Sequence, residues 1–306
     1  MNATVPLVSI LIPAYHARFF AEAFESARAQ TYPSIEIVVC DDSRDDAIER
    51  IVLDRPDPRV RYVHNPERLG FARNFSRCFE LARGEYVKFL NDDDRLRPHC
   101  VEKLAGILRV NGGVTLATSR RRVIDAQGDV QPDVIPTMPI SHVSAIMLGG
   151  DLGNFALANG LNFIGEPSTV LFRRAQVTLE DELLFRWGGH DYHCLADMSL
   201  WLRLLMQGLA YYDAESLSDY RRHDGQEQER EGMRFECTLE RMWIARQARS
   251  VGFLATPRLW NTAIGRIVER VEPFRTSPLV DATVHRRADA LMEEARAELA
   301  PESIQE

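Results

Sequence analysis

Short apolar runs rich in β-branched residues alternate with amphipathic stretches over the first hundred residues. In one amphipathic stretch, residues 71–82, Phe75, Cys78 and Phe79 recur at helical spacing. Strands that alternate with helices indicate a parallel sheet covered by helices, so we expect an α/β fold. The predicted strands span residues 8–15, 36–42, 60–65 and 86–94, and the predicted helices span residues 19–30, 71–82 and 98–110.

The pattern is less regular in the middle of the chain and becomes helical toward its end. These changes predict three parts, residues 1–115, 116–225 and 226–306. In the second part we expect strands at 114–125 and 167–174, a loop at 128–139, a helix or lid at 141–158, a helix at 197–207 and paired strands at 209–223. In the third part we expect helices at 235–250, 257–272 and 281–299.

The charge of the chain narrows the classes of partner. The 306 residues carry a formal net charge of -8, and the calculated isoelectric point is about 5.6. A protein that binds the phosphate backbone needs clustered Lys and Arg, so we expect no nucleic-acid partner.

The cysteines and the N-terminus suggest where the protein works. Five cysteines are present, an odd number, and no two have CxxC spacing, which argues against a zinc site or a disulfide framework and favours a reducing compartment. The first residues lack the basic segment of a signal peptide, and no apolar stretch approaches the ~18 residues of a membrane span. We therefore expect a cytoplasmic protein, with peripheral contact at the inner face of the cytoplasmic membrane left open. The cysteines are Cys40, Cys78, Cys100, Cys194 and Cys237.

Three of the predicted strands end in polar sequences, which read PAYH, DDSRDD and NDDD. Ligands bind at the carboxyl ends of parallel strands, so these ends point to one acidic site. A divalent cation would neutralise carboxylates there, since hard cations prefer oxygen ligands. The alternatives are a solvated acidic turn and, for Asp45 or Asp46, the N-cap of the next helix.

At this point the chain resembles a family 2 glycosyltransferase of the GT-A fold. The matching segments are VSILIPAYH, QTYPSIEIVVCDDSRDD, NPERLGFARNFSRCFELARGEYVKFLNDDDRL, GEPSTVLFRR, LADMSLWLRLLMQG and YRRH, in the family's order, across about residues 7–225. The resemblance implies a Rossmann-like, mostly parallel sheet flanked by helices; the C-terminal helices would be an extension. It also implies nucleotide contacts, at Pro13, Ala14, Tyr15, Asp41, Asp42, Arg73, Asn74, Asn91 and Asp92.

The metal motif of the family falls on residues 91–93. The resemblance makes Asp93 the ligand of Mg²⁺ or Mn²⁺ and brings His223 toward the metal or the diphosphate; a surface histidine is the alternative for His223. Asn91 stands where the family usually has Asp, and its amide can still bind a ribose hydroxyl. Asp94 is expected to support the turn or the acceptor side.

The catalytic base of the family lies in an acidic pair before a helix, and here the pair reads Ala196-Asp197. The resemblance makes Asp197 the base, although the acid before it is missing. The alternative is an N-cap for a helix that starts at Met198. Asp191 is the reserve candidate, and Trp187 is a weaker candidate for an aromatic face toward the acceptor.

The resemblance implies an inverting, metal-dependent glycosyltransferase of hexosyltransferase type. It would move a sugar from a nucleotide-diphosphate sugar to a hydroxyl of a glycan, lipid-linked or protein acceptor, in the assembly of lipopolysaccharide, O-antigen or capsule. A sugar-phosphate nucleotidyltransferase is disfavoured, because PAYHARFF lacks the glycine-rich loop of that class. A non-catalytic nucleotide-sugar-binding protein stays open because of Asn91 and Ala196. The oligomeric state is left open.

Overall fold

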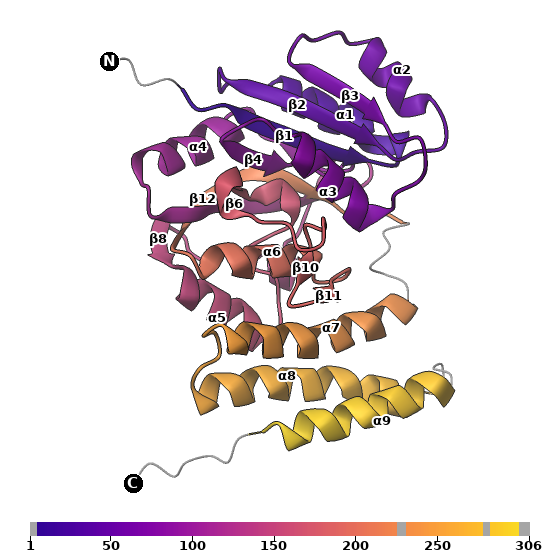
Figure 1. The fold of residues 1–306 in the computed structure, drawn as a ribbon, viewed down its shortest axis with the longest axis vertical. Helices are drawn as coiled ribbons and strands as arrows, with labels where there is room; N and C mark the ends of the chain where they lie inside the picture. Colours follow the sequence, from indigo (N-terminus) through magenta and orange to yellow (C-terminus); the bar gives the residue numbers. More distant parts are fainter. Residues whose placement is uncertain (1–4, 225–230, 278–281, 300–306) are drawn as a thin grey trace.

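A mixed β-sheet forms the centre of the computed structural model, which describes residues 5–224, 231–277 and 282–299 (Figure 1). Within these residues the sheet has ten strands, in the order β3-β2-β1-β4-β9-β6-β12-β5, with β7 beside β6 and β8 beside β12. The strands are β1 Val8–Ala14, β2 Ile35–Asp41, β3 Val60–His64, β4 Tyr86–Phe89, β5 Arg95–Leu96, β6 Val114–Ile124, β7 Val130–Gln131, β8 Ala145–Leu148, β9 Leu171–Arg173 and β12 Leu209–Arg221; a separate hairpin joins β10 Arg186–Trp187 to β11 His190–Asp191.

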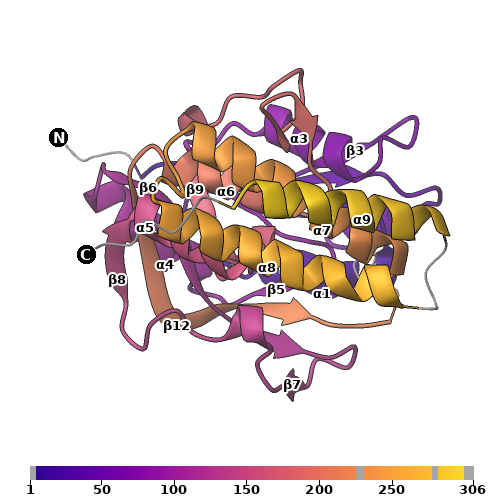
Figure 2. The same ribbon diagram turned by 90° about the horizontal axis from the view of Figure 1, so that it is seen from below.

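Helices cover both faces of this sheet, and the last three helices lie together at one side of the molecule (Figures 1 and 2). Strand β1 is buried on both faces: Ile10 and Ile12 pack in one hydrophobic core, and Leu11 packs in the other. A strand buried on both faces needs a continuous apolar run, which is the pattern in the sequence. The helices are α1 Ala17–Arg28, α2 Ala47–Leu53, α3 Phe71–Leu81, α4 Cys100–Val110, α5 Gly149–Asn159, α6 Ala196–Leu205, α7 Glu231–Ser250, α8 Pro257–Thr276 and α9 Ala282–Ala297.

The N-terminal half of the sheet is parallel, as predicted. Strand β1 pairs in parallel with β2 and β4, and β2 pairs in parallel with β3. The strands therefore end at one edge, where the three polar sequences follow β1, β2 and β4. The sheet continues from residues 1–115 into 116–225 through β6, β9 and β12, so the division at residue 115 stays a prediction.

The predicted paired strands at 209–223 are wrong. This segment forms one strand of 13 residues, β12, which lies parallel to β6. The pairing of β12 with β6 shifts in register between Asp213 and Ser216, and Ala214 and Glu215 lie within this shift. A β-bulge accommodates extra residues in this way without reversing the chain. The region expected to be a helix or lid, 141–158, instead starts with strand β8 and continues into α5.

The cysteines were expected to form no disulfide framework, but one pair is bonded in the structure. Cys194 is bonded to Cys237 on α7, and the two residues are 43 positions apart in the sequence. Cysteine count and spacing could not reveal the pair, because the contact comes from the packing of α7 against the segment before α6. The bond removes one argument for a reducing compartment. None of the described helices is both long and apolar enough to cross a membrane.

Candidate active site

The turn after β1 is held by a carboxylate from the end of β4. Asp92 accepts hydrogen bonds from the backbone amides of Tyr15 and His16, at 2.7 and 2.8 Å, directly before α1 begins. Burial and the neighbouring Asp93 raise the pKa of Asp92 to about 6. Pro13 and Ala14 are buried in β1 itself. Asp92 thus fixes the shape of the turn that was predicted to line the nucleotide pocket.

Tyr15 keeps part of its ring exposed at this turn. The guanidinium carbon of Arg68 lies 4.4 Å from the centre of the Tyr15 ring, a cation–π distance. Sequence reasoning gave Arg68 no role. Its position brings a positive charge to the edge where a nucleotide diphosphate was expected.

The two acids after β2 are buried and bound to protein groups. Asp41 accepts hydrogen bonds from the Tyr62 hydroxyl and from the Ser43 amide. Asp42 accepts hydrogen bonds from the amides of Leu69 and Gly70, at 2.7 and 2.8 Å. These bonds shape the loop that leads into α3, and contact of either carboxylate with a nucleotide stays a prediction.

Asn74 joins the ends of two strands from the first turns of α3. Its side-chain amide donates to the carbonyls of Ala14 and Cys40, at 3.4 and 3.1 Å, and the residue is 3% exposed. Arg73 is exposed and lines a hollow between α3 and the turn that contains Glu182. Asn74 therefore supports the strand ends from within, and direct contact of Arg73 or Asn74 with a nucleotide stays a prediction.

The acidic sequence after β4 divides into a buried and a partly exposed carboxylate. Asp94 is buried and accepts hydrogen bonds from the Ser168 hydroxyl at 2.6 Å, the Arg221 amide at 2.9 Å and the Asn91 side chain at 3.1 Å. Burial, followed by the charge of Asp93, raises the pKa of Asp94 well above its ordinary value. Asp94 therefore supports the turn, and the side chain of Asn91 helps to hold the same turn through its hydrogen bond to Asp94.

Asp93 is the partly exposed member and faces His223, which follows β12. The carboxylate Oδ2 of Asp93 lies 3.2 Å from His223 Nε2, and the two side chains are 24% and 13% exposed. Arg221 donates from Nε to the backbone carbonyl of Asp93, which holds the two segments together. The two residues predicted as metal ligands are therefore neighbours.

A carboxylate oxygen and an imidazole nitrogen fit a divalent cation such as Mn²⁺. Among the residues that the structure describes, no group of three or more His, Cys, Asp or Glu side chains is arranged to hold a metal. Magnesium-type sites commonly use one or two protein ligands together with substrate phosphates and water. Asp93 and His223 fit that kind of site.

Asp197 lies in the first turn of α6, and the N-cap position is occupied by Leu195. The alternative that Asp197 caps a helix starting at Met198 is therefore wrong. Its Oδ1 accepts the Met198 amide, and its Oδ2 accepts the Asn162 side chain, both at 2.7 Å. Burial and then the charge of Glu166 raise the pKa of Asp197 to about 7. A carboxylate with a pKa near neutrality suits a general base.

Residues 162–168 link this carboxylate to the end of β4. Asn162 at one end binds Asp197, and Ser168 at the other end binds Asp94. Lys88, buried in β4, donates to the carbonyl of Ser168 at 2.5 Å. One short segment thus fixes both acidic groups at the same edge of the sheet.

Glu166 lies in the middle of this segment and was missed in the sequence. It forms an ion pair at 2.7 Å with Arg121, which is 2% exposed and also donates to the carbonyl of Asn162. Its charge contributes to the raised pKa of Asp94 and to that of Asp197, and its segment binds both residues through Ser168 and Asn162. The only signal was its place in GEPSTVLFRR, a matching segment to which no role was given.

The secondary candidates are accounted for by the protein's own contacts. Asp191, the reserve base, forms an ion pair with Arg186 at 2.9 Å in the β10–β11 hairpin. Trp187 is 8% exposed and packs in the core, so it presents no face to an acceptor. Asp197 is therefore the better placed of the two acids.

Comparison with known proteins identifies the family of the chain. The family model described as "Glycosyl transferase family 2" matches residues 9–175. An uncharacterized glycosyltransferase of Rickettsia typhi, RT0329, is 31% identical over 231 residues, which cover 74% of this chain and 67% of that protein. An uncharacterized protein of Mycobacterium tuberculosis, MT1568, is 31% identical over 233 residues, covering 73% and 69%. The chain thus spans about two thirds of these relatives.

Among solved structures, S. aureus TarS 1-349 in complex with UDP-GlcNAc matches with a TM-score of 0.56 and 15% identity, covering 95% of this chain and 87% of that one. At this identity the match concerns the fold, and it confirms the expected GT-A architecture. The family model covers more than half of the chain, and the relatives agree with it. The protein therefore belongs to glycosyl transferase family 2 and is a glycosyltransferase.

Proposed function

We propose that this glycosyltransferase is metal-dependent and inverting, and that it moves a sugar from a nucleotide-diphosphate sugar to an acceptor hydroxyl. One observation carries the proposal: residues 162–168 hold Asp94 and Asp197 at one edge of the sheet. Two groups then serve one donor site: Asp93 as the ligand of the cation, and Asp197, a carboxylate with a pKa of about 7, as the base.

In this proposal Asp93 and His223 hold Mg²⁺ or Mn²⁺. The bound cation would stabilise the negative charge that develops on the departing nucleotide diphosphate. Asp197 takes the proton from the acceptor hydroxyl as the oxygen attacks the anomeric carbon, which inverts the configuration there. The hydrogen bonds from Asn162 and Met198 orient the carboxylate for this task.

The relatives suggest which donors and acceptors to test first. The chain is 35% identical over 130 residues to a chondroitin synthase of Escherichia coli, and the TarS structure was solved with UDP-GlcNAc. A UDP-sugar donor and a glycan acceptor, in surface-glycan assembly, are therefore the first choices. Ile146, Leu148 and Phe155 are each at least 46% exposed on β8 and α5. They offer an apolar surface for the peripheral membrane contact that belongs to this proposal.

Titration calorimetry with UDP and with GDP, each with and without Mn²⁺, tests the donor site. Binding of one nucleotide that requires Mn²⁺, and that Asp93→Ala weakens, would support the proposal. Asp289→Ala is a matched control, because this exposed carboxylate on α9 pairs with Arg275 far along the chain from the site. Equal binding by wild type and Asp93→Ala would remove Asp93 from the site.

Turnover separates the proposed function from its two rivals. Incubation with the nucleotide sugar and an acceptor hydroxyl should release the nucleoside diphosphate and give a product of inverted configuration. Binding without turnover would indicate a nucleotide-sugar-binding protein. Release of pyrophosphate from a nucleoside triphosphate and a sugar 1-phosphate would indicate a nucleotidyltransferase.

A further inference from the structure

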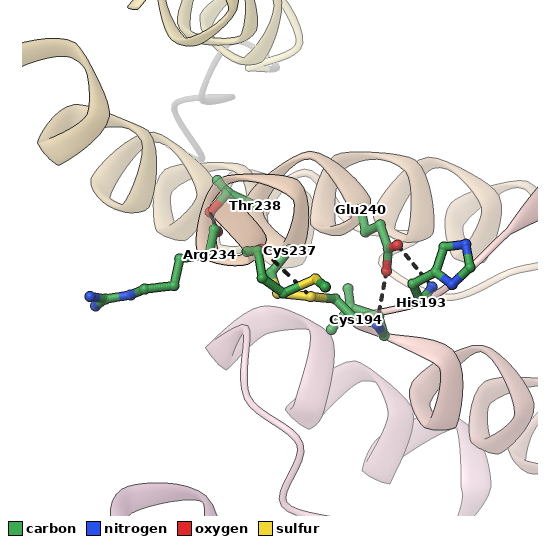
Figure 3. Close-up of a disulfide and its surroundings, with 8 residues drawn as sticks. His193, Cys194, Arg234, Cys237, Thr238 and Glu240 are labelled. Carbon is green, nitrogen blue, oxygen red and sulfur yellow. Dashed lines mark hydrogen bonds between the residues drawn. A yellow bond between two sulfur atoms is a disulfide. The ribbon is translucent and has the colours of Figure 1, made fainter. Parts of the chain in front are cut away.

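The segment that leads into α6 is fastened to α7 by a buried carboxylate (Figure 3). Glu240 is 4% exposed, and each of its two oxygens accepts one backbone amide: Oε1 that of His193 at 2.9 Å, and Oε2 that of Leu195 at 2.8 Å. Cys194, between these two residues, is bonded to Cys237 on the same helix. Three consecutive residues before α6 are therefore tied to α7.

These ties come from one face of α7. Cys237 and Glu240 are three residues apart, a spacing that places both side chains on the same side of a helix. Hydrogen bonds to a charged acceptor are stronger than those between neutral groups, and removing a buried partner costs more than removing a surface contact. The position of residues 193–195 is thus determined by α7 instead of by the local chain alone.

The next residue on α7 reaches the other side of the same site. Arg241 donates to the carbonyl of Gly160 at 2.6 Å, and Asn162, two residues later, donates to Asp197. Arg241 lines the same hollow as Asn162 and Met198, the two residues that donate hydrogen bonds to Asp197. Glu240 and Arg241 therefore hold the two segments that flank Asp197, namely the residues before α6 and the residues after α5.

We propose that α7 is part of the catalytic site, with Glu240 and Arg241 as positioning residues that hold Asp197 at its working place. The inference rests on the proposed function, because it takes Asp197 as the base. Helix α7 lies outside residues 9–175, so the match to the family model says nothing of it. The C-terminal helices thereby acquire a role in transfer besides covering the core.

Glu240→Gln tests this role, because the amide keeps the size of the side chain but has only one acceptor oxygen. Glu236→Gln is the matched control, since Glu236 lies on the same helix and its exposed carboxylate pairs with Arg287. We expect Glu240→Gln to lower kcat about 10–100-fold, the effect of a small displacement of a catalytic group, with the Kd for UDP unchanged. The control should keep the wild-type kcat.

Two readouts separate positioning from general destabilisation. Hydrogen exchange in residues 192–198 should become faster in Glu240→Gln while exchange in β1 and β4 stays unchanged. The acid limb of the kcat–pH profile should move to lower pH. The charged groups that act on Asp197 are Glu166, Arg121 and Arg241. Without the negative charge of Glu240, the positive charge of Arg241 is less compensated. It then stabilises the ionised carboxylate of Asp197 more strongly and lowers its pKa.

A second variant keeps the test decisive if Glu240→Gln does not fold. Arg241→Gln removes the shorter of two guanidinium hydrogen bonds to the Gly160 carbonyl, at 2.6 Å, and leaves that of Arg270 at 3.2 Å. It should lower kcat without changing UDP binding. Wild-type kcat in every one of these two variants that folds, while Asp197→Asn is inactive, would overturn the positioning role and leave the proposed function standing. Full activity in Asp197→Asn would overturn the role of Asp197 as base, and with it this inference. Absence of transfer by the wild type would instead overturn the proposed function itself.

Discussion

Replacing Asp197 by Asn should abolish transfer and at the same time stabilise the protein. Burial, with the charge of Glu166, raises the pKa of Asp197 from 3.8 to about 7. A carboxyl group whose pKa is higher in the folded state than in the unfolded state stabilises the fold only in its protonated form. This contribution is fully present below pH 3.8 and is lost as the pH rises through 7. At the working pH, the protein therefore carries a destabilising charge that asparagine lacks.

The size of the effect follows from the same values. The difference of about 3 pH units between the folded and unfolded states corresponds to about 4 kcal/mol in the free energy of unfolding at pH 8. At pH 4 the same calculation leaves less than about 1 kcal/mol. The asparagine side chain of the variant can still accept the Met198 amide but would place an NH₂ group against the Asn162 donor, which costs about 1 kcal/mol. The expected net gain is about 3 kcal/mol at pH 8 and none at pH 4.

Urea unfolding of wild type and Asp197→Asn at pH 4 and pH 8 measures this difference directly. Titration with UDP and Mn²⁺ should give the same Kd for both proteins, which shows that the donor site is intact. A difference in unfolding free energy that does not change with pH would refute the raised pKa. Wild-type turnover in the variant would refute the role as base.

Three further predictions concern the acidic edge and the disulfide. The kcat should fall about tenfold for each pH unit below about 6, because the base must be ionised and its pKa is about 7. Glu166→Gln should lower this pKa, so the fall in kcat should begin at a lower pH. The same pH dependence in both proteins would contradict the effect of the Glu166 charge. Asp93→Asn should weaken the Mn²⁺-dependent binding of UDP, and calorimetry that shows wild-type Mn²⁺-dependent binding in this variant would exclude Asp93 as a ligand. Breaking the Cys194–Cys237 bond, by reduction or by the Cys194→Ser/Cys237→Ser double variant, should lower the free energy of unfolding by up to about 4 kcal/mol. This is the loop-closure value for a separation of 43 residues. A reductant that leaves urea unfolding unchanged would show that the bond is not formed in solution.

Much of the fold could be predicted because the pattern is local. In β1, every residue from Val8 to Ala14 is buried, so a continuous apolar run identified a strand covered on both faces. In α3, Phe75, Cys78 and Phe79 form one buried face, and the helical spacing revealed it. The paired strands predicted at 209–223 are wrong because the pairing that makes this segment one strand is with β6, far away in the sequence. That pairing continues across a bulge.

The candidate site could be predicted only where a residue follows an element end. Asp93 and Asp197 stand at such places, and the resemblance supplied their roles. Glu166 could not be found in this way, because its meaning depends on Arg121, an ion-pair partner 45 positions earlier in the chain. Glu240 is further still from any motif, and its two acceptor bonds exist only once α7 packs against the segment before α6.

The arrangement of these acids has one energetic consequence for the site as a whole. Asp92, Asp94 and Asp197 each have a pKa raised by burial, and charged neighbours, Asp93 or Glu166, raise it further. Each such group lowers the stability of the fold at neutral pH, so their placement at one edge is unfavourable for folding alone. Perturbed carboxyl groups gathered in this way are characteristic of functional sites. The amides of Tyr15, His16, Met198 and Arg221 and the side chains of Asn162 and Ser168 offset part of the cost, and in doing so they fix where each carboxylate points. The same hydrogen bonds that make the buried acids tolerable therefore orient the groups that the reaction requires.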